Sequence, residues 1–220
     1  MPVKVKICGV RTPVIIETAA EAGADYVGLV LFPGSPRFVE LEEARVLAAI
    51  ARGRIGTAVV MVDPDDALID GVVERVRPDL LQLHGSETPE RVAAIKARTG
   101  LPVIKAVSVE QAGDVAAANA YAASADYILF DAKAGPGAAL PGGNGVAFDW
   151  TALTGFAAPF ALSGGLTPDN VGDAIALTGA ALVDVSSGVE RAPGDKDAEL
   201  VNNFIRAAKS AAAQSRAKAS

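Results

Sequence analysis

The chain has 220 residues, half of them hydrophobic, with a formal net charge of −6, one cysteine and one histidine. This length suffices to bury the core of one large α/β domain or of two small ones. A single cysteine excludes an intrachain disulfide and fits a reducing compartment, while mild acidity without basic clusters argues against a nucleic-acid partner.

Eight short apolar runs recur along the chain at nearly regular intervals. Several are continuous stretches of Val, Ile and Leu, which are typical of strands buried on both faces. The runs cover residues 3–7, 25–31, 55–62, 79–83, 102–107, 126–130, 159–162 and 181–185. Each is followed by a segment of helical character, at residues 12–23, 40–52, 64–77, 87–100, 110–123, 148–156, 168–179 and 196–213.

Eight strand–helix pairs without a linker predict one fold class. They indicate a single (β/α)8 barrel, the TIM-barrel architecture, formed by residues 1–220. A doubly wound open sheet is the alternative, because periodicity does not show whether a sheet closes. Residues 210–220 are expected to be a frayed, solvated tail.

Membrane and metal chemistry are not expected. The uncharged segment 150–168 is interrupted by glycine and proline, and the N-terminus lacks an apolar stretch of signal-peptide length. One histidine and one cysteine are too few for a tetrahedral zinc site without a nearby carboxylate cluster, which the sequence lacks. We therefore expect a cytoplasmic protein without a metal.

In a barrel of this class the active site is built from residues that follow the strands. Two such loops are glycine-rich: "ALSGGLTPDNV" (161–171) and "VDVSSGVE" (183–190). Glycine lets backbone N–H groups approach an anion, and the helix that follows adds a favourable dipole. Although the glycines could simply make tight turns, the pair predicts a phosphorylated small-molecule ligand at Gly164, Gly165, Ser187 and Gly188.

Cys8 and Asp131 are the candidate catalytic groups. Cys8 ends the first strand beside Gly9, where a thiol in an electropositive setting can act as a base. Asp131 ends the apolar run "YILFDAK", where a carboxyl group can act as an acid. The alternatives are a buried, inert cysteine and an aspartate that caps a turn.

Three further features lie at the same expected end of the barrel. Arg37, in "FPGSPRFV", is suited to a substrate carboxylate, although loop arginines are usually just solvated. His84 could shuttle a proton or be structural, and no nucleophilic serine accompanies it. The glycine-rich stretch 134–150 predicts a mobile lid, and its spacing does not form a dinucleotide-binding motif.

Several motifs together resemble the phosphoribosylanthranilate isomerase family, from Val3 to about Phe204. They are "VKICGVRTP", "GADYVGLVLFPGSPRFV", "LLQLHGSE", "YILFDAK…GGNGVAFDW", "ALSGGLTPDNVGDAI" and "VDVSSGVERAPGDKD". The resemblance implies a (β/α)8 barrel that acts in tryptophan biosynthesis. Its reaction is the Amadori rearrangement of N-(5-phosphoribosyl)anthranilate to 1-(2-carboxyphenylamino)-1-deoxyribulose 5-phosphate.

The resemblance also implies residue roles. Cys8 corresponds to the general base and Asp131 to the general acid, and Arg37 faces the anthranilate carboxylate. Substrate contacts are implied at Gln82 and His84, and phosphate contacts at Gly164, Gly165, Ser187 and Gly188. No cofactor is implied, because the substrate nitrogen serves as the electron sink, and the chain is expected to be a monomer or homodimer.

Two small departures from the family pattern concern the lid and the phosphate site. Asn144 stands where the family often has threonine, and Ser163 stands where it often has alanine. Two other functions stay open. One is a phosphosugar isomerase or bifunctional histidine-pathway relative, which usually has an aspartate at the position of Cys8. The other is a non-catalytic barrel that binds a phosphorylated metabolite.

Overall fold

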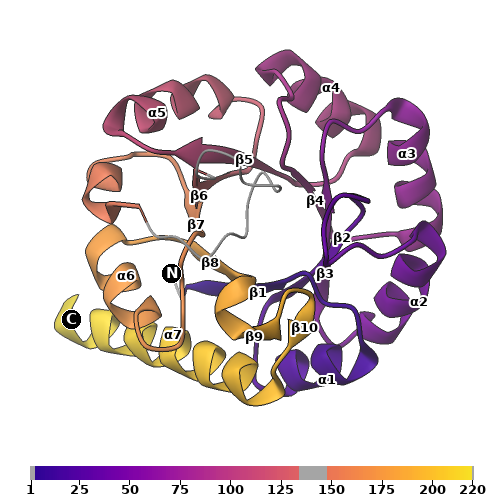
Figure 1. The fold of residues 1–220 in the computed structure, drawn as a ribbon. Helices are drawn as coiled ribbons and strands as arrows, with labels where there is room; N and C mark the ends of the chain where they lie inside the picture. Colours follow the sequence, from indigo (N-terminus) through magenta and orange to yellow (C-terminus); the bar gives the residue numbers. More distant parts are fainter. Residues whose placement is uncertain (1–2, 134–147, 220) are drawn as a thin grey trace.

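The computed structural model describes residues 3–133 and 148–219, with side chains described as far as Ala211. Eight parallel strands form a closed barrel in which each strand pairs with the next and β8 pairs with β1 (Figure 1). The strands are β1 (Lys4–Cys8), β2 (Tyr26–Val30), β3 (Gly56–Met61), β4 (Leu80–Leu83), β5 (Val103–Val109), β6 (Tyr127–Ala132), β7 (Phe160–Leu162) and β8 (Leu182–Val185). The predicted (β/α)8 barrel is confirmed, and the open sheet is excluded.

Helical segments surround the barrel (Figure 1). They are α1 (Pro13–Glu21), α2 (Leu41–Ala51), α3 (Asp66–Gly71) continued by the π-helix η1 (Val72–Val76), α4 (Pro89–Thr99), α5 (Ala112–Ala117) continued by the 3₁₀ turn η2 (Ala118–Tyr121), α6 (Val171–Thr178) and α7 (Ala198–Ala219). Among the described residues, no helix has both the length and the apolar character to cross a membrane.

The structure differs from the predicted helices at two places. The helix expected at 148–156 is only the 3₁₀ turn η3 (Trp150–Leu153). The helix expected from residue 196 begins at Ala198, because a small hairpin of β9 (Glu190–Ala192) and β10 (Asp195–Lys196) precedes it, and α7 continues past residue 213. The predicted fraying of residues 210–220 stays a prediction.

The barrel interior is filled in layers, so it is a packed core and not a pore. The layer nearer the strands' N-terminal ends is apolar and consists of Ala58, Leu80, Ile104, Ala106, Leu129, Ala161 and Leu182. Lys6 and Asp184, which pair across β1 and β8, come next. Cys8, Val30 and Val60 form a small cluster at the strands' C-terminal ends, with Phe32 against it. The layer at the strands' N-terminal ends is therefore apolar, and the reactive side chains lie toward the strands' C-terminal ends.

Local sequence signals account for the helix ends that were predicted. In α4, Thr88 precedes the helix and its hydroxyl accepts the Arg91 N–H, while Pro89 occupies the first turn. Gly100 ends the helix in the left-handed conformation with φ +67°, which glycine adopts without strain. Such signals fix where each helix returns the chain to the next strand.

Candidate active site

Two pockets open at the strands' C-terminal ends. We call the first the apolar pocket, lined by Cys8, Val30, Phe32, Ser35, Arg37, Val60, Val62, Gln82, His84, Asp131, Ser163, Asp184 and Ser186. We call the second the glycine pocket, lined by Asp131, Ser163, Gly164, Gly165, Leu166, Asp184, Val185, Ser186, Ser187 and Gly188. Asp131, Ser163, Asp184 and Ser186 line both. The two pockets therefore adjoin, and a ligand with two chemically different ends can span them.

The apolar pocket suits a flat, apolar group with an anionic substituent. Val30 and Val60 come from the ends of β2 and β3, and Phe32 packs against them. Because neighbouring parallel strands present side chains to the same side at every second residue, these groups share the interior of the barrel. Arg37, a cation, lies on the wall of the same pocket.

All four predicted phosphate-site residues line the glycine pocket. Gly164 and Gly165 have φ of +81° and +67°, a backbone region that favours glycine. A Cβ on Gly188 would lie 1.9 Å from the Leu166 carbonyl oxygen, so the two glycine loops touch there and leave no room for a side chain. Asn170 braces the first loop, because its Oδ1 accepts the Thr167 N–H and its Nδ2 donates to the Gly165 carbonyl.

Cys8 lies beside a buried ion pair. Lys6 Nζ donates to both carboxylate oxygens of Asp184, at 2.9 and 3.0 Å, and the Lys6 side chain is fully buried. A Cβ on Gly28 would lie 3.0 Å from Lys6 Nζ and 3.1 Å from Cys8 Sγ, so this glycine makes room for both groups. Burial raises the pKa of the Cys8 thiol above its ordinary value, and the neighbouring Lys6 ammonium opposes that shift.

Replacing Lys6 by methionine is expected to raise the pKa of Cys8 further, because it removes the opposing cation and leaves the anion of Asp184. If Cys8 is the catalytic base, it must be unprotonated to act, so the acidic limb of the kcat/KM profile moves to higher pH. Cys8 is the chain's one cysteine, so the pH dependence of iodoacetamide alkylation reports its pKa directly.

The single Lys6 variant leaves Asp184 buried without its partner, which lowers the free energy of unfolding by about 3–5 kcal/mol. The double variant Lys6→Met/Asp184→Asn removes both charges and serves as the companion if the single variant unfolds. Because Asp184 shifts the pKa of Cys8 in the direction opposite to Lys6, the double variant is expected to change this pKa less than the single variant does. In the single variant, an alkylation profile and an acidic limb that coincide with those of the unaltered chain would contradict the electrostatic role of Lys6.

Asp131 is buried and faces the only histidine. Its Oδ2 lies 3.4 Å from His84 Nε2, and its Oδ1 accepts the Ala132 N–H at 3.1 Å. His84 Nδ1 lies 3.1 Å from Gln82 Nε2. The tautomer of the ring decides which of its nitrogens donates, and Nε2 makes no hydrogen bond within the described residues. His84 therefore lies beside the Asp131 carboxyl group, and both it and Gln82 line the pocket.

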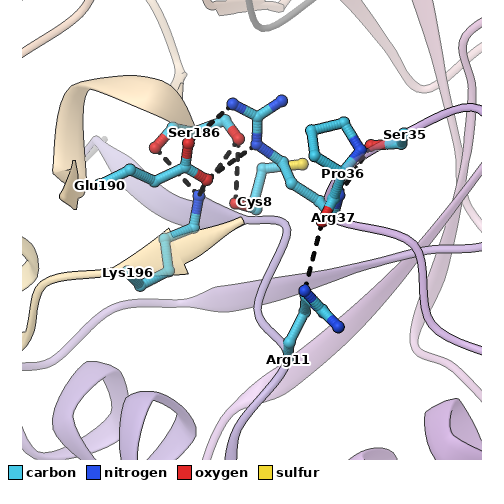
Figure 2. Close-up of polar contacts among 8 residues, drawn as sticks. All are labelled: Cys8, Arg11, Ser35, Pro36, Arg37, Ser186, Glu190 and Lys196. Carbon is cyan, nitrogen blue, oxygen red and sulfur yellow. Dashed lines mark hydrogen bonds and ion pairs between the residues drawn. The ribbon is translucent and has the colours of Figure 1, made fainter. Parts of the chain in front are cut away.

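Arg37 is held by a carboxylate from the hairpin (Figure 2). Its Nε and Nη2 donate to the two carboxylate oxygens of Glu190, each at 2.8 Å, and both side chains are buried. The predicted arginine is therefore in the pocket but is not simply a solvated loop residue. Glu190 takes the Nε–Nη2 edge of the guanidinium and so fixes the plane of this group at the pocket wall.

The structure brings together most of the residues that the sequence singles out. Cys8, Arg37, Gln82, His84 and Asp131 line the apolar pocket. Asp63, which follows β3, and Ser108, which lies near the end of β5, line neither pocket. The predicted lid lies largely within residues 134–147, outside the described residues.

Sequence reasoning did not identify five polar residues at this site: Lys6, Asp184, Ser186, Glu190 and Lys196. A usable signal existed for the first two, because a charged residue inside a strand buried on both faces requires a partner. Within residues 3–133 and 148–211, no group of three or more His, Cys, Asp or Glu side chains could hold a metal ion.

Comparison with known proteins identifies the relatives of this chain. The family model described as N-(5'-phosphoribosyl)anthranilate (PRA) isomerase matches residues 5–207. An N-(5'-phosphoribosyl)anthranilate isomerase from Paramagnetospirillum magneticum is 56% identical over 211 residues, which cover 95% of this chain and 98% of the relative.

Two solved structures are similar along nearly their whole length. One is a phosphoribosylanthranilate isomerase in complex with reduced 1-(o-carboxyphenylamino)-1-deoxyribulose 5-phosphate, with 34% identity and a TM-score of 0.83 over 94% of this chain and 99% of the other. The second describes monomers generated from the dimeric isomerase of Thermotoga maritima, with 35% identity and a TM-score of 0.82 over the same shares.

Proposed function

The chain belongs to the phosphoribosylanthranilate isomerase family and is an isomerase of tryptophan biosynthesis, and from this premise we propose which of its side chains carry the reaction. The observation that supports the assignment best is the pair of adjoining pockets. The substrate, N-(5-phosphoribosyl)anthranilate, has an aromatic acid at one end and a phosphate at the other. Its ribose would then lie at the junction.

The proposed seating follows from the chemistry of each pocket. The anthranilate ring packs against Val30, Phe32 and Val60, and its carboxylate meets the guanidinium of Arg37. The phosphate lies between the two glycine loops, where backbone N–H groups can approach it closely. Asp131 lines both pockets, so its carboxyl group stands beside the ribose.

In the proposed first step, Asp131 donates a proton to the ribose ring oxygen. The C1–O bond breaks, its electron pair stays on the oxygen, and the anthranilate nitrogen lone pair forms an iminium with C1. The hydrogen bond from the Ala132 N–H to the Asp131 carboxylate supports this role, because a general acid must be held within reach of the atom that it protonates.

In the proposed second step, the Cys8 thiolate removes the proton from C2. The electrons of the C2–H bond form the C1–C2 double bond of an enolamine and neutralise the iminium nitrogen. Reprotonation at C1 and loss of the hydroxyl proton at C2 then give the ketone. Each step conserves electrons within the substrate, so the proposal involves neither a metal nor an organic cofactor. Lys6 beside the thiol supports the thiolate form.

Replacing Arg37 by alanine is expected to raise KM by about 10–100-fold and to change kcat much less, because a charge-assisted hydrogen bond to the carboxylate contributes about 1.5–3 kcal/mol to binding. Steady-state kinetics with fresh substrate measure both constants. Arg11→Ala is the matched control, because Arg11 is an exposed arginine that donates to the carbonyl of Pro36 in the same loop. A lower kcat with an unchanged KM would contradict the carboxylate contact.

We also propose a cytoplasmic location and a monomeric or homodimeric state. A catalytic thiol must stay reduced, which a cytoplasmic compartment ensures. The oligomeric proposal rests on the Thermotoga maritima isomerase, which is described as a dimer from which monomers were generated. Size-exclusion chromatography with light scattering measures this state.

A further inference from the structure

The β9–β10 hairpin that follows β8 contains a buried cation, Lys196, which contacts Glu190 of the Arg37–Glu190 pair (Figure 2). Lys196 Nζ lies 2.6 Å from Glu190 Oε1, and the two side chains are only 2% and 4% exposed. Nζ also donates to the carbonyl and the hydroxyl oxygens of Ser186, at 3.0 and 3.2 Å. The same hydroxyl donates to the Cys8 carbonyl, so one network joins the hairpin to the end of β1.

The contacts of Lys196 suit a charged ammonium. Three acceptor oxygens surround Nζ, which matches the three donors of an ammonium group. Although burial by itself raises the pKa of Glu190, Arg37 and Lys196 together hold it below its ordinary value. Burial lowers the pKa of Lys196 from its ordinary value and Glu190 opposes that shift, while the three acceptors around Nζ fit the charged form. With Lys196 as an ammonium, the cluster of Arg37, Glu190 and Lys196 contains two cations and one carboxylate, with a net charge of about +1.

This net charge matters for binding an anion. A bidentate arginine–carboxylate pair alone is neutral, so its attraction for a second carboxylate would be largely cancelled. In the buried cluster, the charge of Lys196 offsets that of Glu190. Glu190 can then fix the plane of the guanidinium without neutralising the site.

We propose that Lys196 is a positioning and charge-balancing residue that keeps Arg37 able to bind the substrate carboxylate. The proposal rests on the assignment of Arg37 to that carboxylate. It assigns specificity for a carboxylated aromatic ring to three residues and not to the arginine alone. Lys196 acts through Glu190 and Arg37 and does not itself touch the substrate.

Binding of two ligands tests the proposal. One is the reduced product analogue, which carries the carboxylate, and the other is the same molecule with an unsubstituted phenyl ring. Lys196→Met is expected to weaken binding of the carboxylated ligand by about tenfold, as the loss of one nearby charge implies. Binding of the phenyl ligand should be unchanged. Calorimetry measures both affinities without depending on turnover.

A double variant separates charge balance from structural support. Lys196→Met/Glu190→Gln removes one charge of each sign, so the net charge of the cluster stays at about +1 and tighter binding of the carboxylated ligand should return. Equal weakening of both ligands in Lys196→Met, or a double variant weaker than the single, would overturn the proposal.

Arg37→Ala distinguishes failure of this inference from failure of its premise. If Arg37→Ala abolishes the preference for the carboxylated ligand and Lys196→Met leaves it intact, the premise holds and the inference is wrong. If Arg37→Ala preserves the preference for the carboxylated ligand, Arg37 does not bind the carboxylate, and the proposed role of Lys196 is wrong as well.

Discussion

Replacing Cys8 by alanine is expected to lower turnover of N-(5-phosphoribosyl)anthranilate by about 10²-fold or more and to leave the fold intact, because it removes the proposed base. Cys8 ends β1 and packs with Val30 and Val60 at the mouth of the barrel, so the change deletes one sulfur atom at the edge of the core. In the proposed seating the phosphate and carboxylate contacts do not involve the thiol, so KM should change less than kcat.

The decay of anthranilate fluorescence with freshly prepared substrate measures this loss. Ser108→Ala is the control, because Ser108 is an exposed residue near the end of β5 that lines neither pocket. Circular dichroism and binding of the reduced product analogue report whether the Cys8 variant is folded. A folded Cys8→Ala variant with nearly normal turnover would remove Cys8 from the role of base.

Replacing Asp131 by asparagine is expected to have an equally large effect, about 10²-fold or more on kcat, because the amide has nearly the same shape but has no acidic proton to donate. The Ala132 N–H can still donate to the amide oxygen, so substrate binding should change little. A deficit confined to kcat is the signature of a lost acid.

The same substitution at the other end of β6 provides a matched control. Asp126 precedes the strand, pairs with Lys96 near the surface and lines neither pocket. Asp126→Asn should therefore cost at most about 1 kcal/mol of stability and leave kcat unchanged. Equal kcat values in the two variants would contradict the role of Asp131.

The barrel was predictable because its strands are buried on both faces. Such strands appear as continuous runs of Val, Ile and Leu, and the eight predicted runs coincide with β1–β8 to within a few residues. The β9–β10 hairpin was missed because "ERAPGDK" is charged and short, without the alternation that indicates a strand. The segment 148–156 was predicted to be a helix but forms only the turn η3. Its apolar residues are too few for the sequence pattern to distinguish a single turn from a longer helix.

The site was predictable only in part. Residues at strand ends could be placed, because the fold brings all eight ends to one face. The pairing of Arg37 with Glu190 joins positions 153 residues apart, and nothing local to either residue indicates it. Lys6 and Asp184 likewise sit within two apolar runs, and only closure of the barrel brings β1 beside β8. The ion pairs between residues far apart in the sequence are therefore the part of the site that only the structure reveals.

The central claim is that Asp131 opens the ribose ring and Cys8 then removes the C2 proton. The decisive measurement is the single-turnover fluorescence decay of substrate carrying hydrogen or deuterium at C2. In Cys8→Ser, where a poor base makes proton removal slowest, deuterium should slow the decay. In Asp131→Asn, where ring opening is slowest, the two substrates should decay alike. Decays that are insensitive to deuterium in Cys8→Ser, or sensitive to it in Asp131→Asn, would contradict the assignment.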